Sequence, residues 1–494
     1  MNKNNSIINF FFFLFFLIFF ISRLYYFAKL SEIGYFSYDR NEDVDEHFVD
    51  IFFRNNSETN GYLILLKFFY FLFTKNINLS LVFYFFNVSI TIISFWFFFD
   101  IFKNYLNKIL LILALSLISY FLIPYEFWRL DHHDHINLFI FTYILWAVHK
   151  VIFTGKYKNH FFFSLVLINL FYTLGFVSTF IVLILIFFLV IKKKIDLIKY
   201  DYIKILFILC LIFFTFLKTF LNSHVASTTV MGGANLLQRT LHAIGEDKFS
   251  DLVENKVILP KGWLNIFNEI KKNNQNIDNI DTRISNIAHG TINNDFLQNF
   301  FIKSNILQIN KDNNKIAFIN DSDIFLKKPW VYNFGYRQTL LDTYFQSYSG
   351  FIFINALKFY PYEILIGQVG NKGLLLTSAQ MLSFTGLFPH YYENQYFYSY
   401  TFNILLIKFF NYFFVIIGSI SFFLIFKSAT KVFKKKNKKI DIFYLFINLF
   451  LIIHVLFISL ITCCENPRIM IMFFFIIVSV IFLNLKFIFF KQNN

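Results

Sequence analysis

The chain has 494 residues, 57% of them hydrophobic and 22% aromatic, and a formal net charge of +15. Its apolar residues fall in runs long enough to cross about 30 Å of hydrocarbon, which excludes an ordinary soluble protein. Its basic residues are not interleaved with aromatic ones on a soluble face, and no P-loop or Rossmann glycine pattern occurs, so we expect neither nucleic-acid binding nor a nucleotide cofactor.

Ten apolar runs predict transmembrane helices, so we expect an all-α polytopic membrane protein with a large outward-facing α or α+β domain. The predicted spans cover roughly 7–24, 79–101, 108–123, 136–154, 160–174, 175–191, 204–222, 402–426, 441–461 and 469–486. The fifth and sixth are the least clearly separated pair. We expect a membrane catalytic module at 1–222, an outward-facing domain at 223–400 and C-terminal membrane helices at 401–494.

Lysine placement predicts the orientation of these spans. The lysine runs 192–194 and 434–436 fall in connections that the ten-span count puts on one face, and the positive-inside tendency makes that face cytoplasmic. The arginines map to the opposite face, where a guanidinium fork is well suited to bind phosphate. The alternative is that single arginines pair with nearby carboxylates. We expect a multi-pass protein of the cell membrane, the inner membrane in a Gram-negative organism, with its active site facing outward.

Two outward segments are large. The first, about 25–78, carries an acidic cluster and then the apolar stretch Gly61 to Thr74, which is too short to span and predicts an interfacial helix. The second, about 223–400, predicts a soluble domain. Its end, 350–388, turns apolar again and is expected to rest on the membrane.

The acidic cluster has the spacing of a site. On a helix, Asp43, Glu46, His47 and Asp50 fall at i, i+3, i+4 and i+7, which places all four on one face. Such a face suits a cation or a substrate hydroxyl, and one of its carboxylates could act as a general base. The alternative is a solvated helix start with acids in its N-terminal turn.

A second cluster follows Arg129 and directly precedes an apolar run, in the order Asp131-His132-His133-Asp134-His135. Ionisable groups at a membrane boundary are expensive and usually functional. Asp131 and His135 have the i, i+4 spacing of divalent-ion ligands, and the mixed oxygen and nitrogen donors do not choose between Mn, Mg and Zn. The candidate ligands are Asp131, His132, Asp134 and His135, with Asp43 from the first cluster. The alternative is a structural role. We interpret His149, His160 and His454 as structural.

The order of these features resembles the GT-C membrane glycosyltransferases, above all the branch of protein O-mannosyltransferases and aminoarabinose transferases. The passage Asp45-Glu46-His47-Phe48-Val49-Asp50-Ile51-Phe52-Phe53-Arg54, followed by Gly61-Tyr62-Leu63-Ile64-Leu65-Leu66-Lys67, is similar to their first outward loop. Glu465-Asn466-Pro467-Arg468 is similar to their late acidic-x-Pro-Arg signature. Asp-His-His at 131–133 resembles the second acidic motif of archaeal oligosaccharyltransferases, whose Trp-Trp-Asp-Tyr-Gly motif is absent here.

This resemblance implies an enzyme that moves a sugar from a polyprenyl-phosphate donor to a glycan, lipid or protein acceptor on the non-cytoplasmic face. Asp45 would be the general base and Glu46 would orient it or the donor. Arg468, with Arg129, would bind the donor phosphate. A divalent ion, Mn or Mg, would be the one cofactor.

Two other classes fit part of the pattern. A polysaccharide ligase or polymerase would share the lipid-linked donor and carry a large outward loop rich in Arg and His. The loop here contains Arg239, His242, Arg283, His289, Arg337 and His390. A metal-binding membrane transporter would account for the histidines after Arg129, but no broken helix pair or inverted repeat is evident.

Overall fold

The computed structural model describes part of the chain. The described residues are 3–32, 64–119 with gaps, 134–191 except 173, 199–223, 232–268 with gaps, 307–310, 315–318, 348–378 with gaps, 439–461 and 475–483 with gaps. Everything below concerns these residues.

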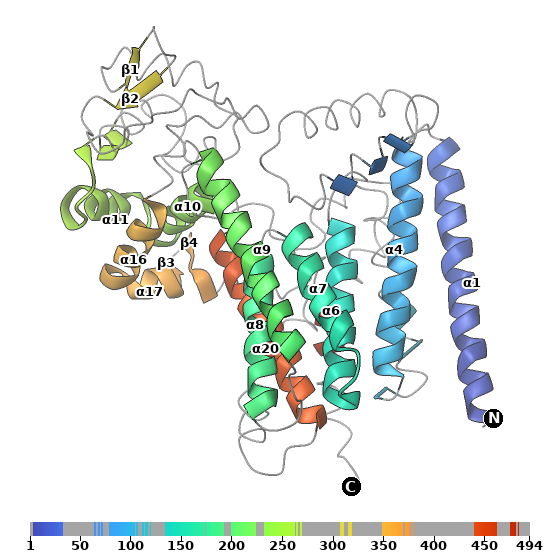
Figure 1. Ribbon diagram of the computed structural model, residues 1–494. Helices are drawn as coiled ribbons and strands as arrows, with labels where there is room; N and C mark the ends of the chain where they lie inside the picture. Colours follow the sequence, from blue (N-terminus) through green and yellow to red (C-terminus); the bar gives the residue numbers. More distant parts are fainter. Residues whose placement is uncertain are drawn as a thin grey trace.

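The described part of the membrane module is a bundle of helices (Figure 1). Its members are α1 (Lys3–Glu32), α4 (Leu79–Phe102), α6 (Asp134–Thr154), α7 (Lys158–Phe171), α8 (Gly175–Ile191), α9 (Lys199–Ser223) and α20 (Lys439–Ile461). Four segments are long and apolar enough to cross a membrane: Leu81–Phe102, His135–Thr154, Tyr200–Leu217 and Lys439–Leu460. The prediction of a helical membrane protein is thus confirmed in this coarser form. The count of ten spans stays a prediction, and the span expected at 402–426 lies outside the described residues.

Aromatic rings hold the bundle together. Phe95 of α4 is fully buried between Phe15 and Phe19 of α1, with ring centroids 5.3 Å away in both cases. It also contacts Phe475, near the C-terminus, at 5.4 Å. These pairs meet nearly edge to face, the arrangement that the ring quadrupole favours. The phenylalanine content therefore supplies the packing between helices as well as the apolar surface.

Contacts along the helices give their directions. Asp100, near the end of α4, accepts a hydrogen bond from the Trp146 indole near the end of α6, so α4 and α6 run parallel. Phe27 of α1 stacks on Tyr84 near the beginning of α4, so α1 runs the opposite way. Lys439 at the start of α20 donates to the Phe153 carbonyl near the end of α6. Consequently α1 and α20 end where α4 and α6 begin. We call this end of the bundle the outer end, after the predicted orientation, and the opposite one the inner end.

Lysines gather at the inner end. Asp100 binds Lys103 at 2.7 Å and Lys150 at 2.6 Å. Asp201, buried at the start of α9, lies 3.3 Å from Lys158 and 3.5 Å from Lys204. Each carboxylate is shared by two ammonium groups, so these two clusters keep a positive excess; the cytoplasmic location of this end stays a prediction.

The predicted fifth and sixth spans are two helices joined by a tight turn. Tyr172 leaves the helical region with φ −118° and ψ 128°, and the Gly175 amide donates to its carbonyl. A Cβ atom at Gly175 would lie 2.4 Å from the Ile168 carbonyl oxygen. Glycine is required at this position because the backbones of α7 and α8 approach too closely for any side chain.

The described part of the outward domain adjoins the outer part of α20, with α16 (Ser349–Phe359) and α17 (Pro361–Leu365) beside it. It also contains α10 (Gly232–Ile244), α11 (Glu246–Asp251) and the π-helix η1 (Leu252–Lys256). The antiparallel strand pairs are β1 (Leu307–Asn310) with β2 (Lys315–Phe318), and β3 (Gly367–Gln368) with β4 (Asn371–Lys372). Phe249, Trp263 and Phe267 form a small aromatic core.

This domain is attached to the membrane bundle through α20. Helix α10 packs on α20, and it also contacts α16 and α17. Ser378 lies 2.8 Å from Ser459 of α20, hydroxyl oxygen to hydroxyl oxygen, and both side chains are buried. Ser459 precedes the last residue of α20 by only two positions, so this contact lies at the outer end of α20.

Replacing Gly175 by alanine is expected to separate α7 from α8. The new methyl group would overlap the Ile168 carbonyl, and relief requires a backbone shift that costs about 1–3 kcal/mol. Thermal unfolding in detergent measures the loss, and Gly350→Ala is the matched control, because nothing lies within 4 Å of a Cβ there. Equal melting temperatures for the two variants would contradict the close approach.

Candidate functional site

Most residues predicted for the site lie outside the described part of the chain. These are Asp43, Asp45, Glu46, Arg129, Asp131, His132 and Arg468. Asp134 is the first residue of α6, but its side chain is not among those described. His135 is described, and it is buried in the first turn of α6. Within the described residues no group of three metal-capable side chains occurs. Because His135 is the only predicted ligand among them, the metal site stays a prediction.

The helices that flank the predicted motifs end or begin together. The segment with Asp45 and Glu46 lies between the end of α1 and the beginning of α4, and the segment with Arg129 and Asp131 directly precedes α6. Arg468 follows the end of α20. All these helix ends belong to the outer end of the bundle (Figure 1). The predicted site residues are therefore attached to a single end, as a shared site requires.

The hairpin of α7 and α8 stops short of that end. Helix α7 has 14 residues and α6 has 21, which correspond to about 21 Å and about 31 Å. At the hairpin turn, the Tyr172 ring lies 5.0 Å from the ring of Phe141 in α6, about 10 Å below the beginning of α6. The outer third of α6 thus extends beyond the hairpin. We call the groups at the level of the turn the floor: Phe141, Asn169, Tyr172, Ser178, Thr179 and His454.

Within the floor, the buried His454 connects α20 to Ser178 of α8. The Nδ1 atom of His454 lies 2.7 Å from the Phe450 carbonyl oxygen, which can only accept, so Nδ1 carries the proton. In the neutral ring, Nε2 then accepts from the Ser178 hydroxyl at 2.6 Å. His454 is 0% exposed. An ionisable side chain this deep in an apolar bundle is conspicuous, because a charge there would be strongly disfavoured.

A second polar pair holds the hairpin closed. The Asn169 amide of α7 donates to the Thr179 hydroxyl of α8 at 2.6 Å and to the Leu165 carbonyl at 2.7 Å. Both side chains are buried. Hydrogen bonds across helices satisfy groups that hydrocarbon cannot solvate. The floor therefore contains polar but uncharged groups, and the Ser178 and Thr179 hydroxyl groups in it each have a hydrogen-bond partner.

Asn137 is the one buried amide above the floor without a visible partner. It is 0% exposed in the second turn of α6, and within the described part of the chain neither its oxygen nor its nitrogen makes a hydrogen bond. Such a group costs free energy and calls for a reason, such as a ligand. Its location between the predicted Asp131-to-His135 cluster and the floor makes it a candidate contact for a polar substrate.

Arg23 has a structural task at the outer end. Its guanidinium is buried, lies over the Phe19 ring at 3.8 Å, and donates to the hydroxyl and carbonyl oxygens of Ser119 at 2.8 and 2.9 Å. It ties the end of α1 to the chain segment before α6. Two further histidines of the bundle bind tyrosines, His149 with Tyr105 and His160 with Tyr143.

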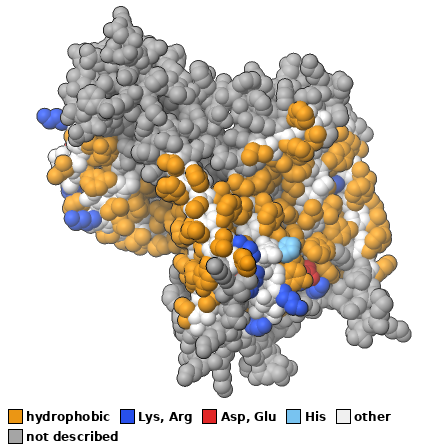
Figure 2. Space-filling view, viewed as in Figure 1, with side chains coloured by type: hydrophobic (Ala, Val, Ile, Leu, Met, Phe, Trp, Pro, Cys, Tyr) orange, Lys and Arg blue, Asp and Glu red, His pale blue; other side chains and the backbone are white. Residues whose placement is uncertain are grey.

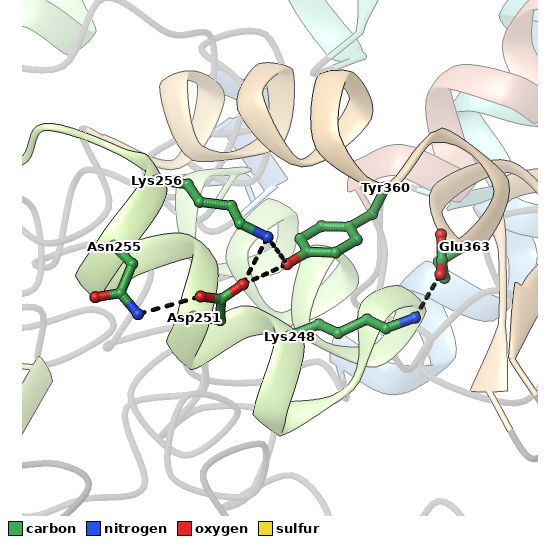
Figure 3. Close-up of polar contacts among 6 residues, drawn as sticks. All are labelled: Lys248, Asp251, Asn255, Lys256, Tyr360 and Glu363. Atoms are coloured by element: carbon green, nitrogen blue, oxygen red, sulfur yellow. Dashed lines mark hydrogen bonds and ion pairs between the residues drawn. The ribbon is translucent and has the colours of Figure 1, made fainter.

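A separate polar cluster joins two parts of the outward domain (Figure 3). Asp251 at the end of α11 binds the Lys256 ammonium at 2.6 Å and accepts from the Tyr360 hydroxyl at 2.8 Å, and Lys248 pairs with Glu363 of α17. The Lys256 and Tyr360 hydrogen bonds lower the pKa of the Asp251 carboxyl from 3.8 to about 2. Every charge drawn in this cluster faces a partner (Figure 3). The cluster therefore serves to fix α16 and α17 on α11 and η1.

The sequence did not indicate the residues of the floor, because their contacts join distant parts of the chain. Ser178 and His454 are 276 positions apart, and each lies alone in an apolar run. Asn137 carried a weak signal, because an amide just inside a predicted span is unusual.

The replacement Ser178→Ala is expected to destabilise the bundle by about 0.5–2 kcal/mol, because it removes the donor to the buried His454 Nε2. Adding His454→Phe should recover part of the loss, since the polar ring is then gone. A double-mutant cycle of thermal unfolding in detergent measures the coupling. Additive effects of the two changes would show that the hydrogen bond contributes nothing.

Acid is expected to weaken the junction in Figure 3. A carboxyl with a lowered folded pKa stabilises the fold above its unfolded value, here 3.8, and this contribution disappears as the pH falls through about 2. Asp251→Asn should therefore unfold at a lower temperature than the wild type at pH 5, and the difference should shrink towards pH 2. A difference that stays constant between pH 5 and pH 2 would be incompatible with this ion pair.

Comparisons of the chain with family models, with curated proteins and with solved structures gave no match. The function must therefore be argued from the sequence motifs and from the arrangement of the helices at the outer end.

Proposed function

We propose that the chain is an integral-membrane glycosyltransferase that moves a sugar from a polyprenyl-phosphate donor to an acceptor at the outer end of the bundle. The observation that carries the proposal is the common end of the flanking helices. The motifs around Asp45, Asp131 and Arg468 are far apart in sequence, yet each is attached to a described helix at that end. This arrangement supports one site built from all three motifs.

The short α7–α8 hairpin supports the same proposal. A polyprenyl-phosphate sugar has an apolar tail, which belongs in the bilayer, and a polar head, which does not. The outer third of α6 and α20, above the floor, is the zone where these two environments meet. Polar, uncharged groups such as the Asn137 amide suit the hydroxyl groups of a sugar.

The proposed reaction is a single displacement. The Asp45 carboxylate takes the proton of the acceptor nucleophile, which attacks the anomeric carbon. The bond from that carbon to the phosphate oxygen breaks, and the lipid phosphate leaves with the electron pair and with inversion at carbon. Arg468 and Arg129 stabilise the negative charge that develops on the phosphate. Glu46 orients Asp45 or the donor.

A divalent ion fits this scheme as a second source of positive charge for the leaving phosphate. Asp131, His132, Asp134 and His135, with Asp43, would hold it. Among these, the described His135 is buried at the start of α6, where its ring is fixed by packing. The acceptor would be a glycan, a lipid or a protein that binds to the outward domain.

Asp45→Asn is expected to abolish transfer of radiolabelled sugar from a pool of polyprenyl-phosphate sugars in membranes that contain the protein. Asp39→Asn is the matched control, because Asp39 is an acid of the same outward segment but lies outside the motif. Chelator should also stop transfer if the Asp131-to-His135 cluster binds a metal. Full activity of Asp45→Asn would rule out the assigned base, and no transfer from any donor would favour the transporter class instead.

Replacing Asn137 by leucine tests whether the amide contacts substrate or only affects the stability of the fold. The substitution removes a buried amide that has no partner in the described residues, so the melting temperature should stay equal or rise. Sugar transfer should fall by at least about tenfold if the amide contacts substrate, as expected for one lost substrate hydrogen bond. Asn169→Leu is the contrasting variant: it breaks the pair with Thr179 and should lower the melting temperature. Unchanged transfer by Asn137→Leu would remove Asn137 from the site.

A further inference from the structure

Helix α16 is apolar on the side that faces away from its own domain. Ile352 and Ala356 are fully buried, and the helix packs on α10. On the opposite side Phe351, Ile354 and Lys358 follow one another at intervals of three and four residues, with Phe351 48% and Ile354 66% exposed. A helix on a water-facing surface carries polar residues there. This helix instead presents large apolar side chains.

The apolar surface continues through α17. Tyr362 is 63% exposed, and Leu365 and Ile366 are exposed around the buried Ile364. Leu357 and Phe359, from the last turn of α16, are exposed as well. We call these exposed residues of α16 and α17 the apolar ridge: Phe351, Ile354, Leu357, Phe359, Tyr362, Leu365 and Ile366. An apolar surface of this extent marks an interaction site.

The apolar ridge lies at the level of the outer membrane boundary. The Ser378–Ser459 contact fixes the chain shortly after β4 to the last turn of α20. In Figure 1, α16 and α17 lie at the height of the upper end of α20 and the middle of α9, not above the bundle. Figure 2 shows apolar side chains on this part of the outward domain and also on the adjoining bundle. The bundle surface there includes α9, whose exposed Phe213 and Phe214 face outward from the helices.

Three lysines lie close to the apolar ridge, and two of them have carboxylate partners among the described residues. Lys248 pairs with Glu363, and Lys256 pairs with Asp251. Lys358 lies over the Phe359 ring at 5.3 Å, and within the described residues no carboxylate lies within ion-pair distance of it. A lysine on an apolar surface extends its ammonium to the lipid headgroups while its carbon chain stays in the apolar layer. Lys248 and Lys256 are paired with carboxylates, so the surface around them can approach the membrane without an unpaired lysine.

We propose that the apolar ridge lies in the headgroup layer of the outer leaflet and that Lys358 binds the phosphate of an anionic lipid there. The occupant of this surface is lipid, because the surface continues that of the membrane bundle and its unneutralised charge is positive. Tyr360 and Tyr362 lie where tyrosine is favoured, at the boundary between hydrocarbon and water. The outward domain is thus held against the bilayer by its own surface as well as by α20. This inference does not depend on the reaction that the protein catalyses.

A fluorescent probe on the apolar ridge tests the location. The full chain, with Cys210, Cys463 and Cys464 replaced by serine, is placed in lipid nanodiscs after Ile354→Cys and labelling with an environment-sensitive dye. Asp247→Cys, an exposed position of α11, is the water-facing control. Quencher groups on the lipid acyl chains should quench the dye at position 354 at least about twofold more than at position 247. Equal quenching at the two positions would overturn the proposal and leave a protein partner or a second copy as the occupant.

Changes at Lys358 test the phosphate contact. When anionic phosphatidylglycerol replaces part of the neutral phosphatidylcholine, the dye at position 354 should shift to shorter wavelength. Lys358→Gln should abolish this response to anionic lipid, and Lys358→Arg should keep it. Both variants should retain the acyl-chain quenching, which depends on the apolar side chains. An undiminished response of Lys358→Gln to phosphatidylglycerol would refute the assignment of Lys358.

Discussion

The length of α7 sets the architecture of the outer end. A helix of 14 residues covers about 21 Å, less than the hydrocarbon layer of about 30 Å. Its turn into α8 must therefore be satisfied inside the bundle, by protein groups instead of water. The close approach at Gly175, the Asn169–Thr179 pair and the Ser178–His454 pair all serve this turn. The floor and the zone above it follow from that one short helix.

Two kinds of contact stabilise this arrangement, aromatic pairs and polar or charged pairs, and they occur at different depths of the bundle. Phenylalanine pairs such as Phe95 with Phe475 fill the bundle where nothing polar is needed. Among the described bundle residues, the carboxylates of Asp100 and Asp201 lie near the inner end, where each is shared by two lysines, and the buried Arg23 lies toward the outer end. The floor lies between the apolar interior and the outer end, and its groups are polar but uncharged. This gradient is compatible with the proposed binding of a polar lipid headgroup at the outer end, above the apolar interior.

The sequence predicts the helices well where a long apolar run ends in charges. The spans expected at 79–101, 136–154 and 441–461 agree with α4, α6 and α20 within a few residues. The break between α7 and α8 was predicted only weakly, because Tyr172 and Gly175 are the sole local signals in a continuous apolar run. The floor could not be predicted, since it depends on contacts between α8 and α20 that no local pattern encodes. The acidic and histidine motifs were evident in the sequence, but of their side chains only that of His135 lies within the described residues.

Helix α20 carries two contacts that belong to different parts of the molecule. His454 binds Ser178 in the floor, and Ser459, little more than one helical turn further on, binds Ser378 of the outward domain. Both contacts are short hydrogen bonds between buried groups, so a shift of α20 along its axis would strain both of them. A displacement of the outward domain is thereby transmitted to the level of the α7–α8 turn. Helix α20 therefore couples the position of the outward domain to the geometry of the α7–α8 turn.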